Sequence, residues 1–336
     1  MNILAFLIIL FQGAASLKDK RIITTLKYSS FRVKPVVVEG RPVNIEDVPY
    51  LVSIKDIGKK IDEKNYKWVN LCGGSIISLS IVLTAAHCFE EHHFYYTRRF
   101  DLLGVSAGSI YTNLIHDGTP VTTAAGQWRI IRQIILHPDF LFPLNDLALV
   151  SVKPDWSFTN YIKPIHVSKR NTEYPSECYI AGYGRRGHGR TSAKSDVLLK
   201  APIRVFTTIQ CSVIWQMDMS TYICTDASFG DVSSGDSGGP LVCFGTAEAG
   251  NNPLLVGVVS GKNYDKTTLF TRVAAYKSWI DKIDNTNGGK TEACSLLLVI
   301  TSLLLYLAFH SHRAISFGIN LKFNSAPQRL GLFYVK

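Results

Sequence analysis

The sequence predicts an all-β fold. From Tyr50 onward, short apolar runs alternate with turns rich in Gly, Asn and Asp, and Val and Ile dominate these runs. Helical periodicity is absent until the end of this part of the chain, and strands do not alternate with helices, so the pattern favours closed antiparallel barrels. Near residue 283, Trp279, Ile280 and Ile283 recur at helical spacing and predict a closing helix over 276–283. The predicted strands include residues 51–54, 75–79, 130–136, 147–152 and 255–259.

The N-terminal residues 1–16 are predicted to be a signal peptide. A continuous apolar run covers residues 3–11, and small residues follow it at 13–16, as signal peptidase prefers. Residues 17–36 are basic and are interpreted as a short pro-segment; a solvated linker would look the same. The folded domain is then expected over 37–284 of a secreted protein.

Charge and cysteine usage exclude two other classes of protein. Of the net charge of +10, +5 falls in residues 17–36 and +4 in residues 285–336, which leaves the predicted domain nearly neutral and gives no reason to expect nucleic-acid binding. The seven cysteines include no Cys-x-x-Cys pair and show no zinc-ligand spacing. Disulfides in an oxidising compartment are therefore expected, without a metal or another cofactor.

The C-terminal tail, residues 285–336, differs in composition from the domain. Residues 293–309 form a run of seventeen mostly apolar residues, the short end of the range for a membrane-spanning helix. Only basic charges follow it, as the positive-inside rule favours for a cytoplasmic end. Two interpretations stay open: a single-pass anchor at the plasma membrane with the domain outside, or a poorly ordered terminus of a secreted protein. Cys294, the odd cysteine, lies in this tail.

Three short motifs point to nucleophilic catalysis. They are Thr84-Ala85-Ala86-His87-Cys88, Asn145-Asp146-Leu147-Ala148-Leu149 and Gly235-Asp236-Ser237-Gly238-Gly239-Pro240. A serine hydroxyl is a weak nucleophile that needs a base and an orienting acid, and these motifs supply one residue of each type. In this order they resemble the chymotrypsin/trypsin family of serine endopeptidases.

The resemblance covers residues 37–284 and implies two six-stranded antiparallel β-barrels with the active site between them. It implies that Ser237 is the nucleophile, His87 the base and Asp146 its orienting partner. The N–H groups of Gly235 and Ser237 would form the oxyanion hole. The resemblance also pairs Cys72 with Cys88, Cys178 with Cys243, and Cys211 with Cys224. The family's further bridge would need cysteines at Ser233 and after Ser260, and both are missing.

Activation and specificity are also implied by the resemblance. Cleavage before Val37 would let its new ammonium pair with Asp236, although Val36 stands where trypsin-like activators require Arg or Lys. Asp231 matches the base of the primary pocket and favours a substrate Arg or Lys. Ser260 matches the serine that supports the aspartate and borders the substrate site. Thr268 stands where trypsin-like pockets carry glycine, and Lys262 is able to neutralise Asp231.

The expected function is therefore a zymogen of a serine endopeptidase with a weak preference for Lys or Arg before the scissile bond. Its expected partners are polypeptide substrates, an activating protease and protein inhibitors. The basic residues near 185–194 are interpreted as solvated surface or as a nicking site for a trypsin-like enzyme. The alternative is a non-catalytic homologue that acts as a binding or regulatory module, which Val36, Lys262 and Thr268 favour.

Overall fold

The computed structural model describes residues 36–38, 40–174, 178–184, 195–226, 231–233, 235–263 and 267–286. The chain divides into two compact units, residues 1–285 and residues 286–336, and the strands described below lie in the first. The predicted signal peptide, the pro-segment before Val36, the basic loop and the apolar run at 293–309 lie outside the described residues. Within the described ranges, no helix is long and apolar enough to cross a membrane.

The first barrel is a closed ring of six antiparallel strands. Its order is β10-β5-β4-β3-β6-β9, and pairing of β9 with β10 closes it. Two short strands extend it: β7 (Leu114–His116) pairs with β4, and β8 (Val121–Thr122) pairs with β9. The six strands are β3 (Leu51–Lys60), β4 (Tyr66–Ile76), β5 (Ile81–Thr84), β6 (Leu103–Ala107), β9 (Gln127–Leu136) and β10 (Ala148–Lys153).

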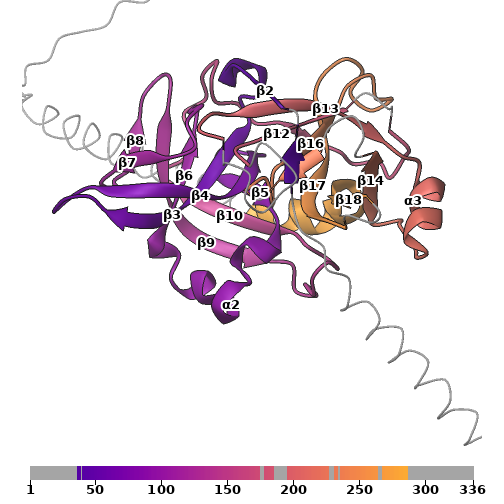
Figure 1. The fold of residues 1–336 in the computed structure, drawn as a ribbon, viewed down its shortest axis with the longest axis horizontal. Helices are drawn as coiled ribbons and strands as arrows, with labels where there is room; N and C mark the ends of the chain where they lie inside the picture. Colours follow the sequence, from indigo (N-terminus) through magenta and orange to yellow (C-terminus); the bar gives the residue numbers. More distant parts are fainter. Residues whose placement is uncertain are drawn as a thin grey trace, which may run out of the picture. The chain divides into compact units, whose positions relative to one another are not determined.

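The second barrel is built in the same way from the later part of the chain, and the two barrels lie side by side (Figure 1). Its order is β17-β16-β12-β13-β14-β18, closed by pairing of β17 with β18. Short strands β11 (His166–Val167) and β2 (Arg41–Pro42) pair with β17 and β13. The six strands are β12 (Cys178–Gly182), β13 (Leu199–Val205), β14 (Tyr222–Asp226), β16 (Pro240–Cys243), β17 (Leu254–Lys262) and β18 (Thr268–Arg272).

The two six-stranded barrels that the resemblance implied are confirmed. The helix at the end is confirmed too, as η4 (Val273–Tyr276) followed by helical residues 277–286. Two expectations are wrong. The run 75–79 is not a strand throughout, because β4 ends at Ile76 and a turn leads to β5. Two eight-residue helices were not predicted, α2 (Glu91–Arg98) and α3 (Thr208–Trp215). The remaining short helices are η1 (Ile45–Asp47), η2 (Ala86–Phe89) and η3 (Phe100–Leu102).

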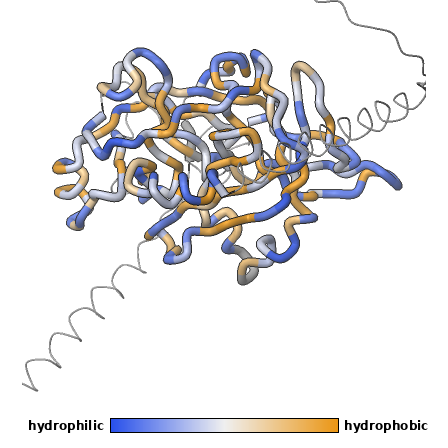
Figure 2. Tube along the Cα trace, turned by 180° about the vertical axis from the view of Figure 1, so that it is seen from behind, coloured by the Kyte–Doolittle hydropathy of each residue, from blue (hydrophilic) through white to orange (hydrophobic). Residues whose placement is uncertain are grey.

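Burial of the alternating Val, Ile and Leu side chains explains why these segments form barrels. Hydrophobic positions run through the body of the fold, and hydrophilic ones gather in its outer loops (Figure 2). Each buried aliphatic side chain of this kind typically contributes roughly 1.5–3 kcal/mol. Three disulfides join segments of the fold: Cys72–Cys88, Cys178–Cys243 and Cys211–Cys224, the pairs that the resemblance implied.

Candidate active site

His87 and Asp146 both come from the first barrel. His87 lies in η2, directly after β5, and the disulfide between Cys72 and Cys88 ties this short helix to β4. Asp146 lies two residues before β10, which pairs with β5. His87 Nδ1 is 2.7 Å from Asp146 Oδ2, and the backbone N–H of His87 donates to Oδ1 at 2.9 Å. These two contacts fix the imidazole ring against the carboxylate and leave Nε2 to face away from it.

Ser260, from the second barrel, completes the surroundings of this carboxylate. Its hydroxyl donates to Asp146 Oδ2 at 2.6 Å, and both side chains are fully buried. The pairing of β17 with β18 shifts register between Val259 and Gly261, so Ser260 is the extra residue of a β-bulge. A bulge re-aims a side chain out of the regular alternation. The bulge is thus what turns Ser260 toward Asp146.

Ser237 lies in the loop that leads from β15 (Asp231–Ser233) to β16 of the second barrel. Its carbonyl accepts a hydrogen bond from Gly73 N at 2.8 Å, and Gly238 N donates to Val259 O at 2.9 Å. Gly238 has a φ of +75°, and a Cβ there would collide with Thr84 Oγ1. The loop with Ser237 therefore packs directly against the end of β5, three residues before His87.

Gly235, predicted to line the oxyanion hole, adopts a φ of +105°. Residues that carry a Cβ rarely adopt this backbone conformation. Its carbonyl accepts a hydrogen bond from Asn70 Nδ2 at 2.8 Å. A Cβ on Gly235 would approach this nitrogen to 3.1 Å. Glycine thus permits both the backbone conformation and the close contact with Asn70.

Asp236 is a buried carboxyl group beside the nucleophile candidate. Its side chain is 1% exposed, and Gly184 N donates to Oδ1 at 2.9 Å. Burial raises the pKa of this carboxyl well above its usual range, and the Gly184 bond opposes that shift. Val37, its predicted partner after cleavage, lies in β1 (Val36–Val38) of the intact chain, and its Cα is paired with that of Val232 in β15. Val36, assigned to the pro-segment, is thus part of a paired strand.

Two of the predicted pocket residues are neighbours across a strand pair. Lys262 in β17 lies opposite Thr268 in β18, so their side chains are on the same face of the sheet. Both are buried, at 4% and 0% exposure, and burial lowers the pKa of Lys262 to about 8. Asp231 begins β15, and its backbone alone is described.

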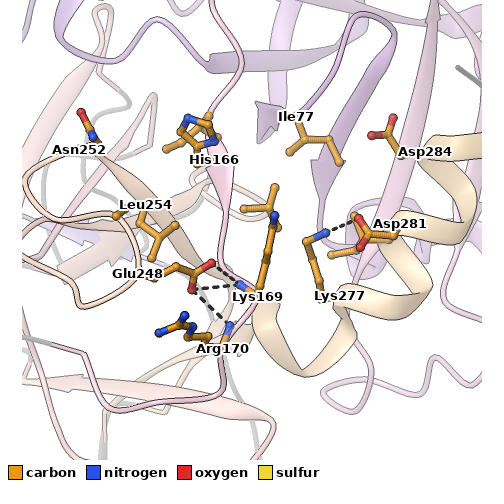
Figure 3. A pocket seen from close by; sticks show the side chains of 14 residues that line it. Ile77, His166, Lys169, Arg170, Glu248, Asn252, Leu254, Lys277, Asp281 and Asp284 are labelled. Carbon is orange, nitrogen blue, oxygen red and sulfur yellow. Dashed lines mark hydrogen bonds and ion pairs between the residues drawn. The ribbon is translucent and has the colours of Figure 1, made fainter.

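A cavity of about 570 Å³ in the described part of the chain is not lined by any predicted site residue. In its wall (Figure 3), Glu248 accepts from the backbone N–H of Lys169 at 2.9 Å and from that of Arg170 at 3.2 Å, and Lys277 pairs with Asp281. Among the described residues, no cluster of His, Cys, Asp and Glu could hold a metal ion.

Residues around Gly235 that the sequence did not single out are Asn70, Ser53 and Lys55. Ser53 Oγ donates to Asn70 Oδ1 at 2.5 Å, and Lys55 Nζ donates to Ser53 Oγ at 3.0 Å. One signal was available. Ser53 and Lys55 are polar residues at spacing two in the first half of β3, among Leu51, Val52 and Ile54, which places both on one face.

Comparison with known proteins agrees with the fold. The profile of the Trypsin family matches residues 37–280. Serine protease 41 of Homo sapiens is 28% identical over 249 residues, which cover 69% of this chain and 74% of that protein. Ovochymase of Halocynthia roretzi is 29% identical over 227 residues, 64% of this chain but 14% of that much longer protein. The chain belongs to the trypsin family of serine proteases.

Proposed function

We propose that this chain is a secreted serine endopeptidase, made as a zymogen, that hydrolyses peptide bonds through Ser237, His87 and Asp146. The single observation that carries the proposal is the set of hydrogen bonds on Asp146. This fully buried carboxylate accepts from His87 Nδ1, from His87 N and from Ser260 Oγ. Such an arrangement orients a base; a merely buried histidine would not need it.

In the proposed reaction, Ser237 Oγ attacks the scissile carbonyl while His87 Nε2 takes its proton. Asp146 holds the imidazole tautomer with the proton on Nδ1 and favours the imidazolium that forms. The N–H groups of Gly235 and Ser237 then bind the oxyanion of the tetrahedral intermediate. His87 returns the proton to the leaving amine, and water hydrolyses the acyl-enzyme by the same steps.

Activation would follow cleavage before Val37. Burial of a carboxylate costs free energy, and the raised pKa of Asp236 expresses that cost. The ammonium created at Val37 would offset it and stabilise the loop that carries Ser237. Activity should therefore depend on that cleavage.

A weak preference for Lys or Arg before the scissile bond is the specificity we propose. Asp231 would attract the basic side chain of the substrate, and the bound substrate would exclude water from around this charge pair. Lys262 and Thr268, buried side by side, would narrow the pocket and oppose a second cation. These two residues also support the second candidate function, a non-catalytic homologue that binds or regulates a partner.

The deciding experiment is hydrolysis of a peptide library by protein secreted from cells, with N-terminal sequencing of the active fraction. We expect cleavage by wild type, an N-terminus at Val37, and complete loss of cleavage in Ser237→Ala at an unchanged melting temperature. Val36→Arg is the matched activation variant, because trypsin should then cut before Val37 and raise activity. If the trypsin-cut Val36→Arg protein cleaves no peptide, the binding-module function is favoured instead.

A further inference from the structure

We propose that Lys55 is a positioning residue for the oxyanion hole, acting on Gly235 through a chain of hydrogen bonds made by Ser53 and Asn70. Lys55 is a lysine with 0% exposure, which is unusual because the burial of an ammonium costs free energy. Its position is therefore not explained by stability. The inference rests on the proposed function and adds a residue to its machinery.

The strand register brings the three side chains together. Ser53 and Lys55 lie two residues apart on β3 and so share one face. Lys55 is directly opposite Asn70 on β4, because the pairing shifts register just before Lys55. All three side chains are buried. This hydrogen-bonded chain from Lys55 through Ser53 to Asn70, called the relay below, is thus built into the β3–β4 strand pair.

While Lys55 is protonated, the donors and acceptors of the hydrogen-bonded chain allow one direction only. Lys55 Nζ donates to Thr112 O at 2.6 Å and to Ser53 Oγ at 3.0 Å. An ammonium group has no acceptor, so Ser53 must accept from it and pass its own hydrogen on. Ser53 Oγ donates to Asn70 Oδ1 at 2.5 Å. The other end of the Asn70 amide, its NH₂ group, is then the one that faces Gly235.

The last bond of the relay acts on the catalytic loop. Asn70 Nδ2 donates to Gly235 O at 2.8 Å, and Gly235 has the φ of +105° that makes its two flanking peptides sensitive to rotation. Holding the carbonyl restrains rotation about this residue, whose N–H is the proposed oxyanion donor. If Asn70 turned over, its oxygen would face the Gly235 carbonyl and repel it.

Geometry also separates the relay from a purely structural role. The hydrogen bond from Lys55 to Thr112 O holds a neighbouring loop. The hydrogen bond from Lys55 to Ser53, in contrast, leads through Ser53 to Asn70 alone. Burial lowers the pKa of Lys55 to about 7, so the fold pays for this lysine in stability. Replacing it by Met, which has a similar shape and no hydrogen to donate, should slow catalysis without weakening the fold.

The test is a double-mutant cycle of Lys55→Met and Asn70→Leu, in activated protein, with kcat, KM and the affinity for a peptide aldehyde measured for each variant. Loss of one oxyanion donor typically lowers kcat about 10²–10³-fold, so partial misorientation should lower it roughly tenfold in Lys55→Met, with KM within about twofold. Aldehyde affinity should fall by the same factor, because its hemiacetal uses the same hole. The double variant should be no slower than Asn70→Leu alone.

Arg129→Met is the matched control. Arg129 is the other fully buried cation of the first barrel, and it donates to the carbonyls of Val121, Trp128 and Asp155, away from Gly235. It should lower stability and leave kcat and aldehyde affinity unchanged. Unchanged kcat in Lys55→Met, or losses that multiply in the double variant, would overturn the relay.

A second readout keeps the inference separate from the proposed function. In the Ser237→Ala background, the side-chain NH₂ resonances of Asn70 should broaden or shift, and exchange faster with solvent, when Lys55 becomes Met. If wild type hydrolyses no peptide, the proposed function fails, and this NMR comparison still decides the relay. Identical Asn70 resonances with and without Lys55 would refute it.

Discussion

At the scale of single residues, the proposed site depends on buried polar groups, and several of their hydrogen bonds meet at one carboxylate. The carboxylate of Asp146 accepts three hydrogen bonds, and the two that come from side chains come from different barrels. The residue types of His87, Asp146 and Ser237 were predictable because the chemistry requires them in recognisable motifs. The contribution of Asn70 was not, since an asparagine in a strand carries no local signature of what its amide will contact.

The hydrogen bond from Ser260 to Asp146 predicts a measurable effect on the rate. Bonds to charged groups contribute roughly 1.5–3 kcal/mol, and two other donors remain, so Ser260→Ala should lower kcat about tenfold with little change in KM. Ser151→Ala is the control, because the buried hydroxyl of Ser151 has no hydrogen-bond partner in the described structure. Equal rates for the two variants would show that the Ser260 bond does not serve catalysis.

Lys55 predicts a pH dependence of stability. Its pKa is about 7 in the folded chain and near 10.5 when unfolded, so between these values the unfolded chain binds more protons at this site. Wild-type stability should therefore rise with pH across this window, relative to Lys55→Met. Urea unfolding should be measured at about pH 6.0, below this window, and at about pH 9.5, within it. The free energy of unfolding of Lys55→Met should exceed that of wild type by less at the higher pH.

The exposed Lys67 provides the comparison for that experiment. Lys67→Met on β4 should leave the difference between the two pH values as in wild type. A stability difference between wild type and Lys55→Met that is equal at both pH values would contradict a lowered pKa for Lys55.

Lys262 and Thr268, the buried pair assigned to the proposed pocket, predict how substitutions should change substrate specificity. Thr268→Gly widens the pocket, and Lys262→Gly removes a competing cation, so both should raise kcat/KM on Lys and Arg substrates. Thr268→Gly should favour Arg substrates more, because the guanidinium fork needs the greater width. Asp231→Ser should abolish the basic preference. A wild-type preference for aromatic or small residues, measured over peptides varied at one position, would mean that Asp231 does not govern the pocket.

At the scale of elements, the strands were predictable and the short helices were not. Runs of Val and Ile identify β3, β9, β10 and β17 because burial of alternating side chains is what forms them. Helix α3 has little apolar periodicity, and its signal was a capping box: Thr207 accepts from Gln210 N, and Gln210 reaches back to Thr207 N. The bulge at Ser260 left no sequence signal, because register depends on the partner strand.

The cap of α3 predicts a stability effect without an effect on catalysis. Thr207→Ala should lower the free energy of unfolding by about 1 kcal/mol, since one N-terminal N–H loses its acceptor. Val213→Ala is the control on the same helix, at a side chain that is 72% exposed, and it should change stability little. A loss of kcat in Thr207→Ala would mean that α3 is coupled to the site in a way that its contacts do not indicate.

At the scale of the whole molecule, neither barrel contains all the residues of the proposed site. The first supplies His87 and Asp146, and the second supplies the loop with Ser237 and the hydroxyl of Ser260. The resemblance could anticipate this division, because triad motifs in this order occur on the two-barrel fold. It could not anticipate that Lys262 and Thr268 face each other across two strands, or that Lys55 is buried behind the loop.

The most direct test of the central claim is the rate at which a fluorophosphonate modifies Ser237. The probe reacts with a serine whose proton a neighbouring base removes, so it reports the joint action of Ser237, His87 and Asp146 without a specificity pocket. With the trypsin-cut Val36→Arg protein, we predict one probe per chain, mapped to Ser237 by mass spectrometry, and rates at least about 10³-fold lower in the same protein carrying His87→Ala or Asp146→Asn. Labelling at other residues only, or equal rates in all three proteins, would contradict the assignment of this site.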